Sequence, residues 1–170
     1  GGGYAVSLLG LKPSTDYRFR AAVTKDGTEF LSDEGSFTTG NVPASFPGNT
    51  SDLLSLDGHH DGLLLTSLIC EDSMAVIYDS DGDPVWWHGP AKRGKSLILR
   101  AALSRDRRSV LYLVEADPEE GSDQPIRDLV KIALDGRAME VVDVPGGHHD
   151  FLELADGTIV WAAMDGDDET

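Results

Sequence analysis

Two adjacent histidines and an aspartate, His148, His149 and Asp150, are the residues of this sequence best suited to chemistry. Neutral imidazole can act as a nucleophile, a base or a metal ligand near neutral pH, and a neighbouring carboxylate fixes its tautomer and favours its charged form. The three residues stand directly in front of two apolar runs, 151–154 and 159–163, that predict a strand pair. Because neighbours on a strand face opposite sides, we expect at most one of the two imidazoles to face a common site.

The same arrangement occurs earlier in the chain, as His59, His60 and Asp61 in front of another apolar run. The two copies are 89 residues apart, which is twice a period of about 40–45 residues and is typical of two blades of a β-propeller. His59 and His60 are therefore candidates for contact with a substrate, although they adjoin a predicted linker. For both copies, the alternative is a histidine-aspartate pair that only satisfies the hydrogen bonds of a loop.

Two further features of the sequence concern charged residues: an arginine within an apolar run and a series of alternating carboxylates. Arg100 lies within the otherwise apolar run 97–104, and such a charge tends to be paired or to face a channel. Residues 79–83 carry alternating carboxylates as a calcium loop does, yet Pro84 stands where an EF-hand requires glycine. We interpret this segment as an acidic hairpin and predict no metal site.

The composition argues against several classes of function. The chain has 14 lysines and arginines against 30 aspartates and glutamates, and its formal net charge of −16 opposes attraction to nucleic acid or anionic lipid. It contains no apolar run of the roughly 18–20 residues that span a membrane. No P-loop, dinucleotide-binding glycine pattern, serine nucleophile elbow or paired-cysteine zinc pattern is present. We therefore predict no cofactor, no nucleic-acid partner and no membrane span within these 170 residues. The oligomeric state has no sequence signal.

The elements that must position these residues are short strands, so the sequence predicts an all-β protein. No segment has the periodicity and caps of a long amphipathic helix. Adjacent Trp86 and Trp87 are interpreted as packing aromatics on a strand, with a stacking platform for an aromatic substrate as the alternative. The predicted strands are 5–9, 16–24, 35–39, 63–70, 74–79, 85–88, 97–104, 109–115, 128–133, 139–144, 151–154 and 159–163.

Residues 1–40 resemble the second half of a fibronectin type III β-sandwich. The run 11–19, Leu-Lys-Pro-Ser-Thr-Asp-Tyr-Arg-Phe, is similar to the tyrosine corner of those modules, and Ser-Phe-Thr-Thr at 36–39 is similar to their closing strand. In such a corner the Tyr17 hydroxyl bonds back to the backbone, which is a structural role.

The rest of the chain divides at a segment rich in proline, glycine and serine. Residues 41–58 have no sustained periodicity and predict a linker. Residues 59–170 predict about two blades of a propeller and the start of a third. Because a propeller closes with about four to eight blades, we expect the C-terminal part to be an incomplete ring.

Two motifs in this order resemble the bacterial arylsulfotransferases that do not depend on 3′-phosphoadenosine-5′-phosphosulfate. The run 75–87, Ala-Val-Ile-Tyr-Asp-Ser-Asp-Gly-Asp-Pro-Val-Trp-Trp, is similar to an early strand pair of that family. The run 148–157, which begins His-His-Asp-Phe and ends in Gly157, is similar to a channel-lining element of the family. Members of the family carry an N-terminal β-sandwich before a six-bladed propeller. The order of a β-sandwich followed by propeller blades is the one predicted for this chain.

The resemblance implies transfer of a sulfuryl group from an aryl sulfate to a phenol through a sulfated histidine. It assigns His148, His149 and Asp150 to the catalytic site, as groups that stabilise sulfuryl charge or move the phenol proton, with Arg100, His59 and His60 as substrate-binding candidates. The family's nucleophilic histidine comes from later blades, so we expect the 170 residues alone to be inactive. The resemblance also implies a periplasmic or extracellular protein, with or without a lipid anchor. The alternative is a secreted propeller that binds or scaffolds without catalysis.

Overall fold

The computed structural model of the protein describes residues 5–46, 62–69, 72–89, 96–118 and 124–164. Within these ranges every regular element is a β-strand, and the strands form five small antiparallel sheets. The predicted all-β class is confirmed. No helix with the length and apolarity of a membrane crossing occurs in this described part of the chain.

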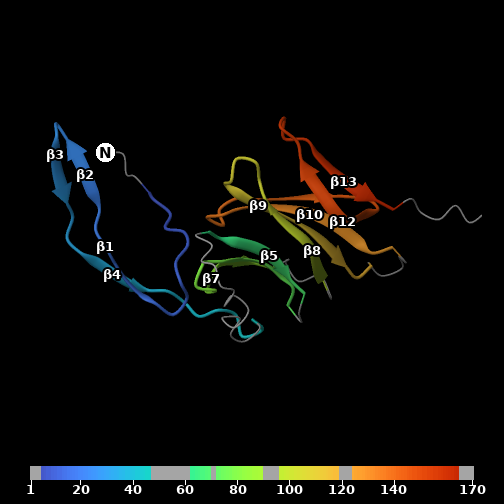
Figure 1. Cartoon of the computed structure of the whole chain (residues 1–170), viewed down its shortest axis with the longest axis horizontal. Coiled ribbons are helices and arrows are strands. Elements are labelled where there is room, and N and C mark those ends of the chain that lie inside the picture. The colour runs from blue at the N-terminus through green and yellow to red at the C-terminus, as the bar shows by residue number, and fades with distance from the viewer. Residues whose placement is uncertain (1–4, 47–61, 70–71, 90–95, 119–123, 165–170) are drawn as a thin grey trace, which may run out of the picture.

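The N-terminal strands form two separate pairs at one end of the molecule, drawn in blue in Figure 1. Strand β1 (Asp16–Phe19) pairs with β4 (Gly35–Thr38), and β2 (Ala22–Lys25) pairs with β3 (Thr28–Leu31). The predicted tyrosine-corner bond is confirmed, because the Lys12 amide donates to the Tyr17 hydroxyl at 2.8 Å. This bond fixes the loop that leads into β1.

Two strand predictions in this region are wrong. Residues 5–9 are not a strand, since they find no partner in the described part of the chain, and the Val6 side chain is left exposed. The expected strand 16–24 is divided into β1 and β2, and the intervening chain changes partner. The reason is the Asp26-Gly27 turn, whose φ angles of 51° and 77° suit a tight hairpin. That turn folds β3, which was not predicted, against β2.

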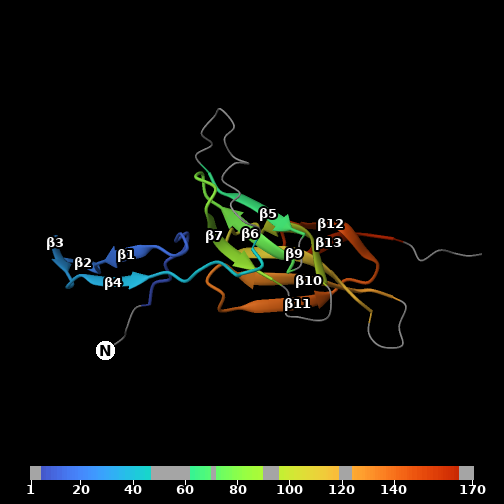
Figure 2. The same ribbon diagram turned by 90° about the horizontal axis from the view of Figure 1, so that it is seen from below.

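Nine strands form the remaining three sheets, each a meander in chain order (Figure 2). The first sheet holds three strands, the second holds four in the order β11-β10-β9-β8, and the third holds two. Their bounds are β5 (Leu64–Leu68), β6 (Met74–Tyr78) and β7 (Pro84–His88); β8 (Ser96–Leu103), β9 (Ser109–Ala116), β10 (Ile126–Ala133) and β11 (Met139–Asp143); β12 (Gly147–Glu153) and β13 (Ile159–Ala163).

The core lies between these three sheets. Alternate side chains along β9 pack against different neighbouring sheets. Val110, Tyr112 and Val114 pack against the first sheet, whereas Leu111 and Leu113 pack on the opposite face with residues of the third sheet. All five are buried. A strand covered on both faces reads as a continuous apolar run, as β9 does in the sequence.

The first and second sheets are also joined by polar contacts that place β5 beside β8. The buried Ser73 hydroxyl donates to the Leu68 carbonyl and accepts from the Ile98 amide, both at 2.8 Å. The Trp86 indole packs against the core between the two sheets and donates to the Leu134 carbonyl at 3.0 Å. Trp87 packs on the other face of the first sheet beside Phe46. The prediction that both tryptophans pack on a strand is confirmed.

Candidate functional site

The histidine-aspartate motif lies inside β12 and forms a bulge. β12 begins at Gly147, four residues before the predicted start, because Gly147 pairs with Ala163 and Phe151 pairs with Trp161. The three residues between them therefore oppose a single residue of β13. The additional residues are accommodated at His149, whose φ of 59° lies in the left-handed region that histidine adopts infrequently.

The bulge changes the expected directions of the two imidazoles. In a regular strand His148 and His149 would face opposite sides, but here their ring centroids lie 3.6 Å apart, edge to face. The expectation that the two rings face opposite sides is therefore wrong for this strand, since the bulge brings the rings together, and how many of them face a channel stays a prediction. His148 is half-buried and His149 is exposed.

The sequence alone does not identify a partner for Arg100, and the structure supplies one. Its guanidinium donates to the Asp150 carboxylate across the gap between β8 and β12, and it lies 5.5 Å from the centroid of the Phe151 ring. Of the two alternatives for this charge, pairing and facing a channel, the structure confirms pairing. The side chains of Arg100 and Asp150 remain 41% and 61% exposed, so solvent reaches both charges.

The strand behind the bulge is held firmly. Phe151 is buried in the core between the second and third sheets. Two residues farther on, the Glu153 carboxylate accepts from the Lys131 ammonium at 2.9 Å and from the Arg105 amide at 2.7 Å. These two donors, the lysine first, lower the pKa of Glu153. The exposed motif therefore stands on an anchored strand.

A close backbone approach leads into the bulge. A side chain at Gly147 would place its Cβ 2.8 Å from the Val144 carbonyl oxygen, closer than real contacts allow. The Gly147 amide donates to that same carbonyl at 2.8 Å and closes the turn before β12. Glycine is thus required where the chain turns to present the histidines.

The structure describes four of the six predicted site residues, and it pairs His148 with His149 and Arg100 with Asp150. The other two, His59 and His60, lie outside the described residues, as does Asp61. Residues 47–58 of the predicted linker lie outside them as well. The repeat of the motif along the chain therefore remains a sequence observation.

The acidic hairpin between β6 and β7 binds a cationic side chain, Lys12, which sequence reasoning missed. Asp79, Asp81 and Asp83 bring their carboxylates within 4.8 Å of one another, close enough for a metal ion. The Lys12 ammonium lies among them, at 3.3, 2.7 and 2.6 Å. Hydrogen bonds to these carboxylates, first to Asp81, raise the pKa of Lys12. Lys12 is about 70 residues away in sequence, so no local pattern could reveal this contact.

A second polar contact that sequence reasoning missed joins the first two sheets. His88 Nδ1 lies 2.7 Å from the Tyr112 hydroxyl, and the His88 ring stacks on Trp86. Burial lowers the pKa of His88 and raises that of Tyr112, so both are neutral near pH 7. The pair satisfies two polar groups within the core, which is a structural role.

The chemistry of the candidate site follows from its charges. The site offers two imidazoles and a guanidinium, together with the carboxylate that holds the guanidinium. Such groups can bind an anionic group with oxygen acceptors and move a proton to or from it.

No family model matches this sequence, and searches of curated proteins and of solved structures also find no match.

Proposed function

We propose that this chain carries part of the active site of an aryl-sulfate sulfotransferase. The observation that carries the proposal is the meeting of Arg100, from β8, with the His148-His149-Asp150 bulge of β12. A sulfuryl group presents oxygen acceptors with negative charge, and a guanidinium and imidazoles are suitable donors for it. The resemblance of the sequence motifs supports the same chemistry.

The exposed ion pair suits exchange with a substrate. Because both side chains are substantially exposed, the Arg100–Asp150 pair contributes little to stability. A sulfate oxygen can therefore replace the Asp150 carboxylate on Arg100 at little cost in free energy. Asp150 then becomes free to accept a proton or to polarise a neighbouring imidazole. In this proposal Arg100 binds the sulfuryl oxygens, and His148 and His149 stabilise their charge or protonate the departing phenol oxygen.

The proposed reaction has two transfers. In the first, a histidine nitrogen bonds to sulfur as the sulfur–oxygen bond of the aryl sulfate breaks, and the phenolate leaves with a proton from the site. In the second, the acceptor phenol gives its proton back to the site, and its oxygen bonds to sulfur as the sulfur–nitrogen bond breaks. The resemblance places the nucleophilic histidine in a later segment, so the proposal concerns the full-length protein.

The proposal includes a finer account of the fold. The three sheets from β5 to β13 are taken as two successive propeller blades and the opening of a third, with β5, β8 and β12 innermost. The ion pair between β8 and β12, and the Ser73 contacts between the first two sheets, support this arrangement. The strands β1 to β4 are taken as part of a fibronectin-like sandwich. A periplasmic or extracellular location belongs to the same proposal.

The test is a p-nitrophenyl sulfate assay on the full-length protein, with phenol as acceptor. We expect release of nitrophenol that depends on phenol, and a fall of about 100-fold or more when His148 and His149 are both replaced by alanine. Arg100→Met is expected to lower the rate comparably. The matched control is Arg137→Met, which removes an exposed arginine beside Asp135 in a turn outside the site and should leave the rate unchanged.

The competing function is a binding or scaffold propeller without catalysis. A well-folded full-length protein that releases no nitrophenol from several aryl sulfates would support this alternative. Release that the three substitutions leave unaltered would preserve the activity but remove the bulge from the active site.

A further inference from the structure

Four aspartates in the described part of the chain are followed directly by glycine, and each pair lies in a turn between two strands. The pairs are Asp26-Gly27, Asp81-Gly82, Asp135-Gly136 and Asp156-Gly157. In such a pair the main-chain nitrogen of glycine can attack the aspartate side-chain carboxyl group, because the two are close in the covalent chain and glycine has no Cβ to hinder the approach. Whether a given pair reacts depends on how the fold holds these two groups.

At three of the pairs the fold binds both groups. The glycine amides donate to the backbone carbonyl three residues earlier, at 3.1 Å for Gly82, 2.8 Å for Gly136 and 3.1 Å for Gly157. The carboxylates accept hydrogen bonds from the Lys12 ammonium at 2.7 Å for Asp81, from the Arg137 amide at 3.0 Å for Asp135, and from the Thr158 amide at 2.9 Å for Asp156. Attack at any of these three pairs requires such bonds to break first.

The Asp26-Gly27 turn binds neither group. It joins the paired residues Lys25 and Thr28, and its φ angles of 51° and 77° are both positive, as in a type I′ hairpin turn. The ladder hydrogen bonds of such a hairpin join the flanking residues and not the two central ones. Within the described residues, no donor binds the Asp26 carboxylate and no carbonyl accepts from the Gly27 amide. Both residues are exposed.

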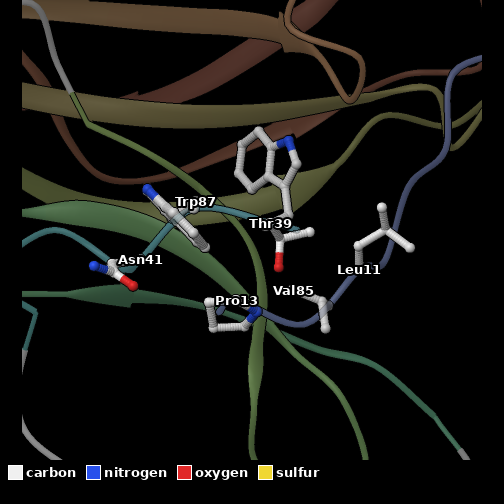
Figure 3. Close-up of a pocket in the computed structure, with 8 residues that line it drawn as sticks. Leu11, Pro13, Thr39, Asn41, Val85 and Trp87 are labelled. Carbon is white, nitrogen blue, oxygen red and sulfur yellow. The ribbon is translucent and has the colours of Figure 1, made fainter. Parts of the chain in front are cut away.

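The strands beside this turn have few contacts that hold them in place. Pro13, before β1, and Asn41, after β4, line one groove with Trp87 of β7, so this end of the N-terminal strands lies against the first sheet (Figure 3). Strands β2 and β3 lie at the far end (Figure 1), and every residue of both is exposed. A hairpin of two strands is marginally stable alone in water. The turn can therefore open locally and bring the Gly27 nitrogen to the Asp26 carboxyl carbon.

We propose that the fold selects Asp26-Gly27 as the pair that isomerises, with Asp26 converted to isoaspartate through a succinimide. The Gly27 nitrogen bonds to the side-chain carboxyl carbon, and the amide proton and the hydroxyl of the protonated carboxyl group leave together as water. Water then opens the ring. Opening at the side-chain carbonyl restores aspartate, whereas opening at the main-chain carbonyl leaves isoaspartate. One water leaves and one enters, so the reaction needs no other reactant and does not depend on sulfuryl transfer.

The modification alters the hairpin that contains it. In isoaspartate the main chain runs through the side-chain carbons, so the turn gains one main-chain atom and the α-carboxylate becomes a side group. The type I′ turn depends on two residues of ordinary length between Lys25 and Thr28. The longer turn therefore does not hold β2 and β3 in their present register.

The experiment follows all four pairs in the folded protein during incubation at mildly acidic pH. Endoproteinase Asp-N cleaves before aspartate and not before isoaspartate, so mass spectrometry of its digests measures the modified fraction at each pair. Isoaspartate should form at position 26 about tenfold or more faster than at 81, 135 or 156, since those carboxylates must first lose a hydrogen bond that involves a charge. Equal rates at the four pairs, or a faster rate at any of the other three, would overturn the proposal.

Unfolding separates the fold from the local sequence as the cause. In about 8 M urea the hydrogen bonds at the other three pairs are lost, so the four rates should converge. If position 26 kept its full lead in urea, the neighbouring sequence would be the cause, and selection by the fold would be wrong.

Two matched variants identify the reacting residue. Asp26→Glu keeps the charge but lengthens the side chain, so the succinimide cannot form and the modified peptide should be absent. Asp33→Glu makes the same change at an exposed aspartate that no glycine follows, and it should leave the rate at position 26 unchanged. Modification that persisted in Asp26→Glu would place the reaction at another residue and overturn the assignment.

Discussion

At the scale of single residues, the Arg100–Asp150 pair illustrates how a contact can matter for function while adding little to the fold. Both side chains are substantially exposed, and exposed ion pairs contribute about 0–1 kcal/mol. We therefore predict a coupling free energy below about 1 kcal/mol in a double-mutant cycle with Arg100→Met and Asp150→Asn. Urea unfolding of the four proteins measures it. A coupling of several kcal/mol would show that the pair is structural and unavailable for exchange.

Glu153 presents the opposite case, because its carboxylate is largely buried and holds two donors. Its pKa is lowered in the folded protein, so its contribution to stability is complete above the pKa of glutamate in the unfolded chain, about 4.3. That contribution is lost as the pH falls through the lower folded value. We predict that Glu153→Gln reduces the free energy of unfolding by about 1 kcal/mol at pH 7, and by progressively less below about pH 4.

Urea unfolding of this variant and of wild type at a series of pH values provides the measurement. Glu29→Gln, on exposed β3, serves as the control and should show little difference at any pH. A Glu153→Gln deficit that persists undiminished at pH 2 would mean that the carboxylate charge is not its source.

At the scale of elements, the bulge in β12 marks the limit of what the sequence could predict. The apolar residues predict a strand from Phe151 onward, and they predict that the polar motif lies just before that strand and not within it. A bulge depends on the register of two strands, which is set by the pairing of Gly147 with Ala163. Strand periodicity carries no information on that register, so the common direction of the two imidazoles could not be foreseen.

The left-handed conformation of His149 gives a direct test of the bulge. A β-branched residue at a φ of 59° is strained by about 1–2 kcal/mol, whereas asparagine tolerates this region well. We predict that His149→Val lowers the free energy of unfolding by about that amount and that His149→Asn changes it little. His148→Val is the matched control, because the φ of His148 lies outside this region. If valine were tolerated equally at 148 and 149, the bulge geometry would be wrong.

At the scale of the whole molecule, local patterns predicted the all-β class and most strands of the last three sheets. The resemblance of residues 11–19 to a fibronectin tyrosine corner also predicted the Tyr17 bond, which spans five residues. The contacts that assemble the sheets were not accessible in this way. Lys12 reaches Asp83 across 71 positions, and Arg100 reaches Asp150 across 50. Each lysine and arginine in the sequence has many acidic residues to choose from, so composition alone does not select the partner.

Lys12 is the residue that best tests how the N-terminal strands are joined to the sheets. Lys12→Met keeps the apolar stem but removes the ammonium, which leaves the carboxylates of Asp79, Asp81 and Asp83 to repel one another. We predict that the N-terminal strands then sample more orientations, so that the radius of gyration measured by small-angle X-ray scattering increases. Because salt screens exposed charges, about 1 M NaCl should produce the same increase in wild type and no further change in the variant.

Lys25→Met is the control for this experiment. It removes the charge of an exposed lysine on β2 without touching the acidic hairpin, so its scattering should follow wild type at low and at high salt. If Lys12→Met also followed wild type under both conditions, the packing of Phe46 against Tyr78 and Trp87 would be sufficient to hold the two parts together. If Lys12→Met expanded while wild type stayed compact in high salt, the Lys12 ion pairs would be protected from solvent and would hold the two parts together.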